Sequence, residues 1–290
     1  LHRYLESEGL PVFDTEEART PGEVAACLER LRSRGFRSAA VKSQIGASGV
    51  GIARVATDGG GVVAVPGSFF YEGECMVQGW IEAGLHGVGE VTSPSVQMFV
   101  GDERVYLYDL TEQILSHESV HEGNVSPPAY LGEREGLAEE LYRQAGIAGE
   151  WLHGQGYRGT ASVDFLVAPV DGRALGEGVY VCEVNARITG ATYPSVLARH
   201  FVPGGAWLMR NLKFDVEESG ERLLEMLADH GHLFVKGGAR GVLPINFNTS
   251  PGGRVGKGQF LCLGETPEEC GELLLQAERE MPVDWNYVRD

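Results

Sequence analysis

Lysine is scarce in this sequence, acidic charge exceeds basic charge, and long apolar runs are missing. The 290 residues hold 24 Lys and Arg against 41 Asp and Glu, a formal net charge of −17 at pH 7. That balance excludes a protein that binds nucleic acid through a broad basic face, although a small phosphate site needs only a few cations. No apolar run approaches a membrane span and no signal peptide is visible, so we expect no membrane partner.

Paired cysteines are missing as well. The five cysteines are odd in number and scattered, and no C-x-x-C pair occurs among them. This usage favours reduced thiols in a cytoplasmic protein over a disulfide framework. The sequence leaves the oligomeric state open, a homodimer included.

Hydrophobic periodicity predicts a mixture of hairpins and helices. Helical spacing is found at 21–34, 133–153, 217–229 and 266–280. Strands are expected at 37–57 around a Gly-rich loop, 74–82, 94–115, 161–168, 178–186 and 240–264. The segment GNVSPP at 123–128 is expected to break the pattern. Such an arrangement favours the α+β class over a repeating βαβ layout.

The segment VCEVNAR places three polar side chains at alternate positions, Glu183, Asn185 and Arg187. On a strand these share one face, and in a hairpin with SVDFLVA the carboxylate of Asp164 falls roughly opposite Glu183. At about 4 Å two such carboxylates repel by roughly 1 kcal/mol in water and by nearer 4 at an effective dielectric of 20. A divalent cation would offset that repulsion, and two carboxylates with an amide oxygen suit Mg²⁺. The alternative is an exposed strand face with an ordinary Glu–Arg pair.

A second signal is KSQIGASGVG, residues 42–51, which is neither a Walker loop nor a Rossmann fingerprint. A strand follows it, so the glycines are expected at the tip of a hairpin whose backbone N–H groups can reach phosphate oxygens. Only four lysines occur, and Lys42 alone follows an apolar strand and precedes such a loop. The alternative is a plain hairpin turn.

Two further segments are weaker signals. In ECMVQGWIEAG, backbone groups around Gln78 to Ile81 could contact an adenine edge, although an ordinary core strand is at least as good an interpretation. The segment HESVH at 117–121 matches the H-E-x-x-H pattern of zinc peptidases, which requires a helix. A strand-like segment precedes it and Gly123 with Pro127 follows it, so we do not expect that helix.

Taken in this order, these segments resemble the ATP-grasp superfamily of carboxylate–amine ligases. The resemblance spans nearly the whole chain, and GYRGTASVDFLV leading into CEVNARITGATYP is its most specific part. The segments QMFV, TEQIL, HEGNVSPP and GVLPINF are most similar to actinobacterial peptide ligases of the pheganomycin type. Gln78 departs from the family, in which many members have Glu at that position.

The resemblance implies two α+β lobes that bind ATP between them, a small lobe at 1–80 and a large lobe at 81–290. It implies that Asp164, Glu183 and Asn185 hold Mg²⁺, and that Arg187 contacts the transferred phosphoryl group or the substrate. The implied nucleotide contacts are Lys42, Gly46, Ser48, Gly49 and Gly51 for the phosphates, and Gln78, Gly79, Ile81 and Glu82 for the adenosine. Such ligases also have an upstream α/β domain and a further lysine, and this chain begins after both would occur.

The resulting hypothesis is an ATP-dependent ligase that joins an amino-acid-like carboxylate to an amine or peptide acceptor through an acyl phosphate. Arg240 and Arg254 are the basic residues expected nearest the substrate, with surface loops as the equal alternative. Within enzymes, the other candidate is carboxylation chemistry like that of biotin carboxylase. A non-catalytic ATP-binding module is the candidate from a different class.

Overall fold

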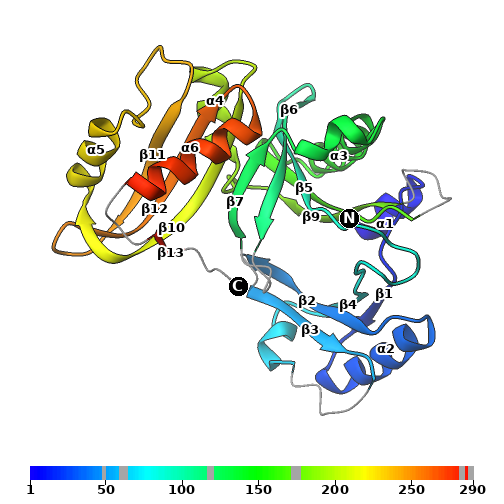
Figure 1. The fold of residues 1–290 in the computed structure, drawn as a ribbon. Helices are drawn as coiled ribbons and strands as arrows, with labels where there is room; N and C mark the ends of the chain where they lie inside the picture. Colours follow the sequence, from blue (N-terminus) through cyan, green and yellow to red (C-terminus); the bar gives the residue numbers. More distant parts are fainter. Residues whose placement is uncertain (48–49, 59–64, 116–120, 171–177, 281–284, 287–290) are drawn as a thin grey trace. The chain divides into compact units, whose positions relative to one another are not determined.

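A computed structural model describes residues 1–47, 50–58, 65–115, 121–170, 178–280 and 285–286 (Figure 1). Contacts divide the chain into two compact units. The small-sheet unit comprises His2–Thr92 and Leu166–Tyr180, and the large-sheet unit comprises Leu1, Ser93–Phe165 and Val181–Asp290. The lobes expected at 1–80 and 81–290 stay a prediction, and each unit is described separately below.

The small-sheet unit contains an antiparallel sheet with the strand order β1-β4-β2-β3. Its strands are β1 Thr15–Ala18, β2 Ser38–Ala47, β3 Val50–Ala56 and β4 Cys75–Gly79, with α1 His2–Ser7, α2 Pro21–Ser33 and the 3-10 helix η1 Gly67–Phe70. Helix α2 has Pro21 at its first turn and buries Val24, Cys27, Leu28 and Leu31 against the sheet, as the spacing predicts. Strands β2 and β3 pair directly in this sheet, which confirms the expected hairpin.

The large-sheet unit contains a nine-stranded sheet with the strand order β11-β12-β10-β7-β6-β5-β8-β9, and β13 pairs with β10. The last two residues of β8 and the first two of β9 are counted with the small-sheet unit. Its strands are β5 Pro94–Val100, β6 Val105–Leu115, β7 His121–Ser126, β8 Gly159–Val167, β9 Val179–Asn185, β10 Ala206–Ser219, β11 Gly241–Thr249, β12 Arg254–Gly264 and β13 Trp285–Asn286. Its helices are α3 Leu137–Gly154, α4 Thr192–Phe201, α5 Gly220–Asp229, α6 Pro267–Glu280 and the 3-10 helix η2 Ala129–Glu133.

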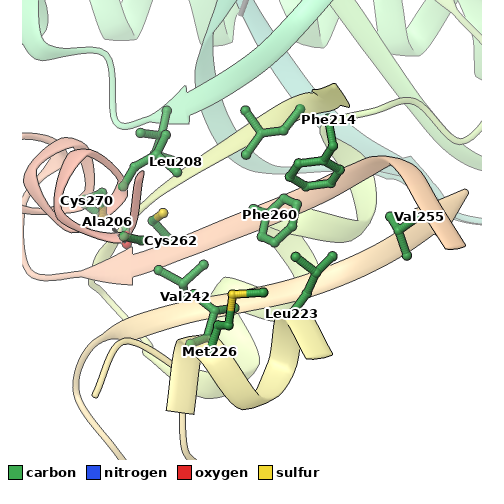
Figure 2. Packing of buried hydrophobic residues seen from close by; sticks show 14 residues of the cluster. Ala206, Leu208, Phe214, Leu223, Met226, Val242, Val255, Phe260, Cys262 and Cys270 are labelled. Carbon is green, nitrogen blue, oxygen red and sulfur yellow. Dashed lines mark hydrogen bonds between the residues drawn. The ribbon is translucent and has the colours of Figure 1, made fainter. Parts of the chain in front are cut away.

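Helices α5 and α6 pack against one face of β10, β12 and β11, and α4 packs against the other. Figure 2 shows the first contact, where Phe260 and Leu223 lie in one buried cluster with Cys270 of α6. On the opposite face, Trp207 and Leu261 form a separate buried cluster with Ala198 of α4. Since successive strand residues point to opposite faces, both faces of these strands are apolar where helices cover them.

Several elements differ from the sequence-based expectation, and α1, β1 and β10 were not expected. Residues 121–126 form β7, although GNVSPP was expected to break the pattern. Gly123 is required there because a Cβ would lie 2.2 Å from the Met209 carbonyl oxygen of the neighbouring strand β10. The helix expected from 217 begins at Gly220, since β10 continues to Ser219, whose hydroxyl accepts a hydrogen bond from the Arg222 amide. Helix α4 was not expected at all.

In the part of the chain that the structure describes, no helix has both the length and the apolar content needed to cross a membrane. The longest of them, α3, is amphipathic, and it packs its buried residues against β5 and β6.

Candidate functional site

The strands β8 and β9 are neighbours in the large sheet, and they bring Asp164 and Asn185 together. The Asn185 side-chain amide donates a hydrogen bond of 3.1 Å to one Asp164 oxygen, and the Ser95 hydroxyl donates one of 2.6 Å to the other. Glu183 lies two residues before Asn185 on β9, so its side chain projects from the same face. The predicted grouping of these three residues on one sheet face is therefore present.

Burial is the main cause of an unusual pKa in this group. It raises the pKa of Asp164 to about 6, and the nearby negative charge of Glu183 acts in the same direction. Three neighbours lower this pKa. The Ser95 hydroxyl has the largest lowering effect, followed by the Arg187 charge and then by the Asn185 amide. The raised pKa means that the charged form of Asp164 is disfavoured. A cation bound beside Asp164 would stabilise that charged form.

The donor set fits a hard divalent cation. Asp164 and Glu183 supply carboxylate oxygens, and the Asn185 side chain directs its amino group to Asp164, which leaves its carbonyl oxygen for a ligand. Among the described residues, no three His, Cys, Asp or Glu side chains come together as a metal site. A metal here would therefore be held by two carboxylates, an amide oxygen and groups from its substrate.

A hydrogen-bonded network fixes the segment that follows Asn185. The buried Gln97 donates to the Ser95 hydroxyl at 2.9 Å and accepts from the Thr189 hydroxyl at 3.3 Å. Thr189 is also bonded to Thr192 at the start of α4. Arg187 lies within this tethered segment, is exposed, and donates to the Ile188 carbonyl at 3.4 Å. Sequence reasoning missed Ser95, Gln97 and Thr189, although Ser95 and Gln97 alternate with apolar residues in PSVQMFV.

Lys42 lies in the small-sheet unit, on β2. It pairs in register with Ile52 on β3 and with Met76 on β4, and its ammonium lies 5.6 Å from the centre of the Phe13 ring. Beyond Lys42 the register of β2 and β3 shifts before Ala47 pairs with Val50.

The predicted phosphate-binding glycines lie at the end of this hairpin. Gly46 falls within β2, and Gly51 on β3 has a φ of 86°, which favours glycine. Ser48 and Gly49, also predicted to contact phosphate, lie outside the described residues. Gly46, Gly51 and Lys42 therefore share one hairpin, as the sequence predicts.

The predicted adenine strand is β4 and the residues after it. The Gly79 amide donates to the Asp14 carbonyl at 2.9 Å, so a ligand could use this N–H only by replacing that bond. Gln78 is buried and donates to the Thr15 hydroxyl at 3.1 Å, while its side-chain carbonyl has no partner among the described residues. Glu82 forms an ion pair with Arg54, whose guanidinium stacks 4.7 Å from the Trp80 ring centre. Ile81 follows Trp80, and its predicted role stays a prediction.

The predicted substrate arginines do not gather in one place. Arg240 precedes β11 and forms an ion pair of 3.1 Å with Glu269 of α6. Arg254 is exposed at the start of β12, opposite Ser219 of β10. Because Gly241 pairs with Leu263 and Thr249 with Val255, these two arginines lie at opposite ends of the β11–β12 pair.

Of the HESVH segment, only His121 falls within the described residues. It belongs to β7 and its Nε2 is 2.6 Å from the Asn124 side-chain oxygen. Burial lowers the pKa of His121, which favours the neutral ring. A strand at His121 is not the helix that a zinc peptidase motif requires.

No family model matches this sequence. A curated ligase from Niallia circulans, [butirosin acyl-carrier protein]–L-glutamate ligase, is 31% identical over 121 residues. Those residues cover 41% of this chain and 25% of that protein, so the chain spans about a quarter of the curated relative it matches.

Solved structures with the same fold cover nearly the whole chain. N5-carboxyaminoimidazole ribonucleotide synthetase from Thermus thermophilus is 15% identical with a TM-score of 0.62, over 97% of this chain and 71% of that one. The biotin carboxylase domain of Hydrogenobacter thermophilus 2-oxoglutarate carboxylase, solved with MgADP and bicarbonate, is 10% identical with a TM-score of 0.62, over 98% and 65%. These likenesses show the fold, and the predicted ATP-grasp fold of the α+β class is confirmed.

Proposed function

We propose that this chain is the ATP-dependent part of a ligase that joins a carboxylate to an amine. The observation that carries the proposal is the grouping of Asp164, Asn185 and Glu183 on one face of the large sheet, with the pKa of Asp164 raised to about 6. The similarity to a ligase that acts on L-glutamate and an acyl-carrier protein supports the same class of reaction.

The proposed reaction has two steps. A carboxylate oxygen of the first substrate attacks the γ-phosphorus of ATP, the bond to the β,γ-bridging oxygen breaks, and ADP leaves. An amine then attacks the acyl carbon of the resulting acyl phosphate, phosphate leaves with the bonding electrons, and the amine loses a proton. Phosphorylation is needed because a free carboxylate has a poor leaving group at neutral pH.

Each predicted site residue has a role in the first step. Asp164, Glu183 and Asn185 would hold Mg²⁺, which neutralises phosphate charge when it is bound. Arg187 is exposed and tethered by the Thr189 network, so its guanidinium is available to phosphoryl or carboxylate oxygens. Lys42 and the glycines of the β2–β3 hairpin would bind the phosphates of the nucleotide, and Gln78, Gly79, Ile81 and Glu82 would surround the adenosine.

Carboxylation is the second candidate, because similar folds include a carboxylase domain solved with bicarbonate. Bicarbonate would then take the place of the first carboxylate, and carboxyphosphate the place of the acyl phosphate. Release of ADP that depends on bicarbonate, and not on any amino acid with an amine, would favour this candidate.

The test is a screen for ADP release with Mg²⁺, ATP, amino acids and short peptides, with bicarbonate as a separate arm. We expect amino-acid-dependent ADP release that Asp164→Asn and Glu183→Gln each lower by about 10² to 10³. Glu272→Gln, at an exposed position of α6, is the matched control and should keep full activity. Full turnover in both site variants would overturn the metal assignment, and the absence of ADP release from every mixture would favour a binding module.

A further inference from the structure

Three adjacent strands of the large sheet carry polar side chains on one face beyond the edge of α4. In register, Asn211 of β10 lies opposite Gln259 of β12, and Lys213 lies opposite Lys257. On the other side of β12, strand β11 places Asn246 opposite Gln259 and Asn248 opposite Lys257. We call these six positions the amide–lysine face: Asn211, Lys213, Asn246, Asn248, Lys257 and Gln259.

The same face changes its chemistry along the strands. Trp207 and Met209 on β10 are buried in the cluster that α4 covers. The next residue on this face, Asn211, is partly buried, and Lys213 after it is exposed. Strand β12 repeats the series from Leu261 through the amide of Gln259 to an exposed lysine. The face therefore runs from apolar through amide to cationic over a few residues.

Hydrogen bonds hold the amides in fixed positions. Gln259 donates to the Asn211 side-chain oxygen at 2.8 Å and accepts from the Tyr193 hydroxyl at 2.6 Å. The Asn246 side chain also donates to Gln259, at 3.4 Å. Beyond them, the Asn211 amide donates to the His121 carbonyl at 3.4 Å. These side chains are ordered by one another, so a ligand would meet a preformed surface.

The two lysines are the unexplained part of this face. The whole chain has four lysines and a formal net charge of −17, yet two of the four lie directly opposite each other on adjacent strands. Like charges in that position destabilise a sheet. None of the six positions holds a carboxylate. Neither ammonium forms an ion pair with a side chain that the structure describes, a set that leaves out residues 215–217 of β10. An anion would relieve the repulsion.

We propose that the amide–lysine face binds the terminal carboxylate of an extended peptide-like molecule. The ammonium groups of Lys213 and Lys257 would hold the carboxylate, as compact point charges suit an anion that binds in several geometries. The amides of Asn248 and Asn246 would then pair with the peptide groups that precede it, since each offers both a donor and an acceptor. A phosphate group shares the anionic chemistry and is the competing ligand.

The inference goes beyond the proposed ligase because it locates a second carboxylate, one that the protein binds without phosphorylating it. Only its identification with the acceptor substrate rests on the proposed function, and the binding itself does not. If peptides bind here while no mixture releases ADP, the ligase proposal fails and this inference stands. If ADP is released but the lysines do not respond to a carboxylate, the reverse holds.

The scarcity of lysine makes the experiment direct. Reductive ¹³C-methylation keeps the charge of lysine and gives one methyl signal for each of the four lysine side chains, besides that of the N-terminal amine, in an NMR spectrum. Single Lys→Arg variants assign the signals. Triglycine, triglycine amide and inorganic phosphate are then titrated separately into the folded chain.

We expect triglycine to shift the Lys213 and Lys257 signals saturably, with triglycine amide binding at least about tenfold more weakly. Lys257→Met should remove the response of Lys213, whereas Lys236→Met is the matched control, at another exposed lysine, and should leave it unchanged. Equal responses to triglycine and its amide, or no response to either, would overturn the proposal. A response to phosphate with none to triglycine would also overturn it, in favour of a phosphate site.

Discussion

Two aspartates on the same face of the large sheet have contrasting surroundings. Asp109 of β6 accepts hydrogen bonds from the Ser126 hydroxyl at 2.7 Å, the Trp207 indole at 3.1 Å and the Leu110 amide at 2.9 Å. The Ser195 hydroxyl of α4 also donates to it. Within the described part of the chain, Asp164 accepts hydrogen bonds from Ser95 and Asn185 alone, and it has Glu183 as a negatively charged neighbour.

The difference separates a structural carboxylate from a candidate functional one. The four donors to Asp109 come from β6, β7, α4 and β10, so its charge is neutralised by dipoles that join these elements. Asp164 has fewer donors than its oxygens can accept and lies near a like charge, which leaves capacity for a cation. The sequence singles out Asp164 through its expected place opposite Glu183, but it does not show the four donors that surround Asp109.

The largest effect should come from exchanging the two carboxylates for amides and measuring ADP release. Asp164→Asn should lower the rate by about 10² to 10³, because the proposed metal site would lose a charged ligand. Asp109→Asn should keep a rate within about tenfold of the original at a temperature where it is folded. Equal losses in the two variants, with both folded by circular dichroism, would contradict the distinction.

For the free energy of unfolding, the expected order of the two variants is the reverse, with the larger loss in Asp109→Asn. Asp109→Asn replaces one acceptor oxygen by a donor amino group and leaves buried hydroxyl or indole N–H groups unpaired, which should cost roughly 2–4 kcal/mol in the free energy of unfolding. Asp164→Asn should cost nothing or be stabilising at pH 7, because it removes a poorly satisfied charge. Urea unfolding of both variants measures this, and a stable Asp109→Asn variant would show that the four hydrogen bonds matter little.

The pH dependence of stability sharpens the same contrast. The folded-state pKa of Asp164, about 6, lies above its ordinary value of 3.8, so the folded protein binds a proton between these values when the unfolded chain does not. The contribution of Asp164 to the free energy of unfolding is therefore fully present below about pH 4. It decreases as the pH rises through 6, by roughly 3 kcal/mol at most.

Urea unfolding from pH 5 to 7.5, without metal, compares the original chain with Asp164→Asn. The original chain should lose stability relative to the variant as the pH rises. Parallel curves would mean that Asp164 ionises normally. Saturating Mg²⁺ and ATP should move the transition to lower pH, since a bound cation favours the carboxylate.

The smallest effect should be at Arg240, a residue that the sequence suggested for substrate binding. Its ion pair with Glu269 is largely exposed, so Arg240→Met should change the free energy of unfolding by about 1 kcal/mol or less. If it also contacts substrate, KM for that substrate should rise while the stability stays nearly constant. An unchanged KM would remove Arg240 from the candidate site.

Much of the fold could be predicted from local patterns. The hairpins around Gly101 and around the Gly-rich loop, and helices α2, α3 and α6, follow from periodicity and turn residues. Helix α4 was missed because its ten residues include Pro194 and the β-branched Thr192 and Val196, which have low helix propensity. Pro194 lies in the first helical turn, where it is tolerated, and the cluster around Trp207 stabilises the helix.

The site was predictable where its residues lie on one strand and not where the sheet brings distant strands together. Glu183, Asn185 and Arg187 show their alternation directly in the sequence. Ser95 reaches Asp164 only because β5 pairs with β8, a pairing of residues 69 positions apart. The pairing of Lys213 with Lys257 likewise depends on the register of β10 and β12, which no local pattern specifies.

Tyr193 gives the two candidate sites of the large-sheet unit a common connection. Its hydroxyl is bonded to Gln259 in the amide–lysine face, and it follows Arg187 by six positions in the same tethered segment. Displacing the Tyr193 hydroxyl would remove a hydrogen bond that helps to fix the segment carrying Arg187. Under the two proposals, a molecule bound at the amide–lysine face would be connected through Tyr193 to the segment that carries Arg187, and such a coupling would impose an order of substrate binding.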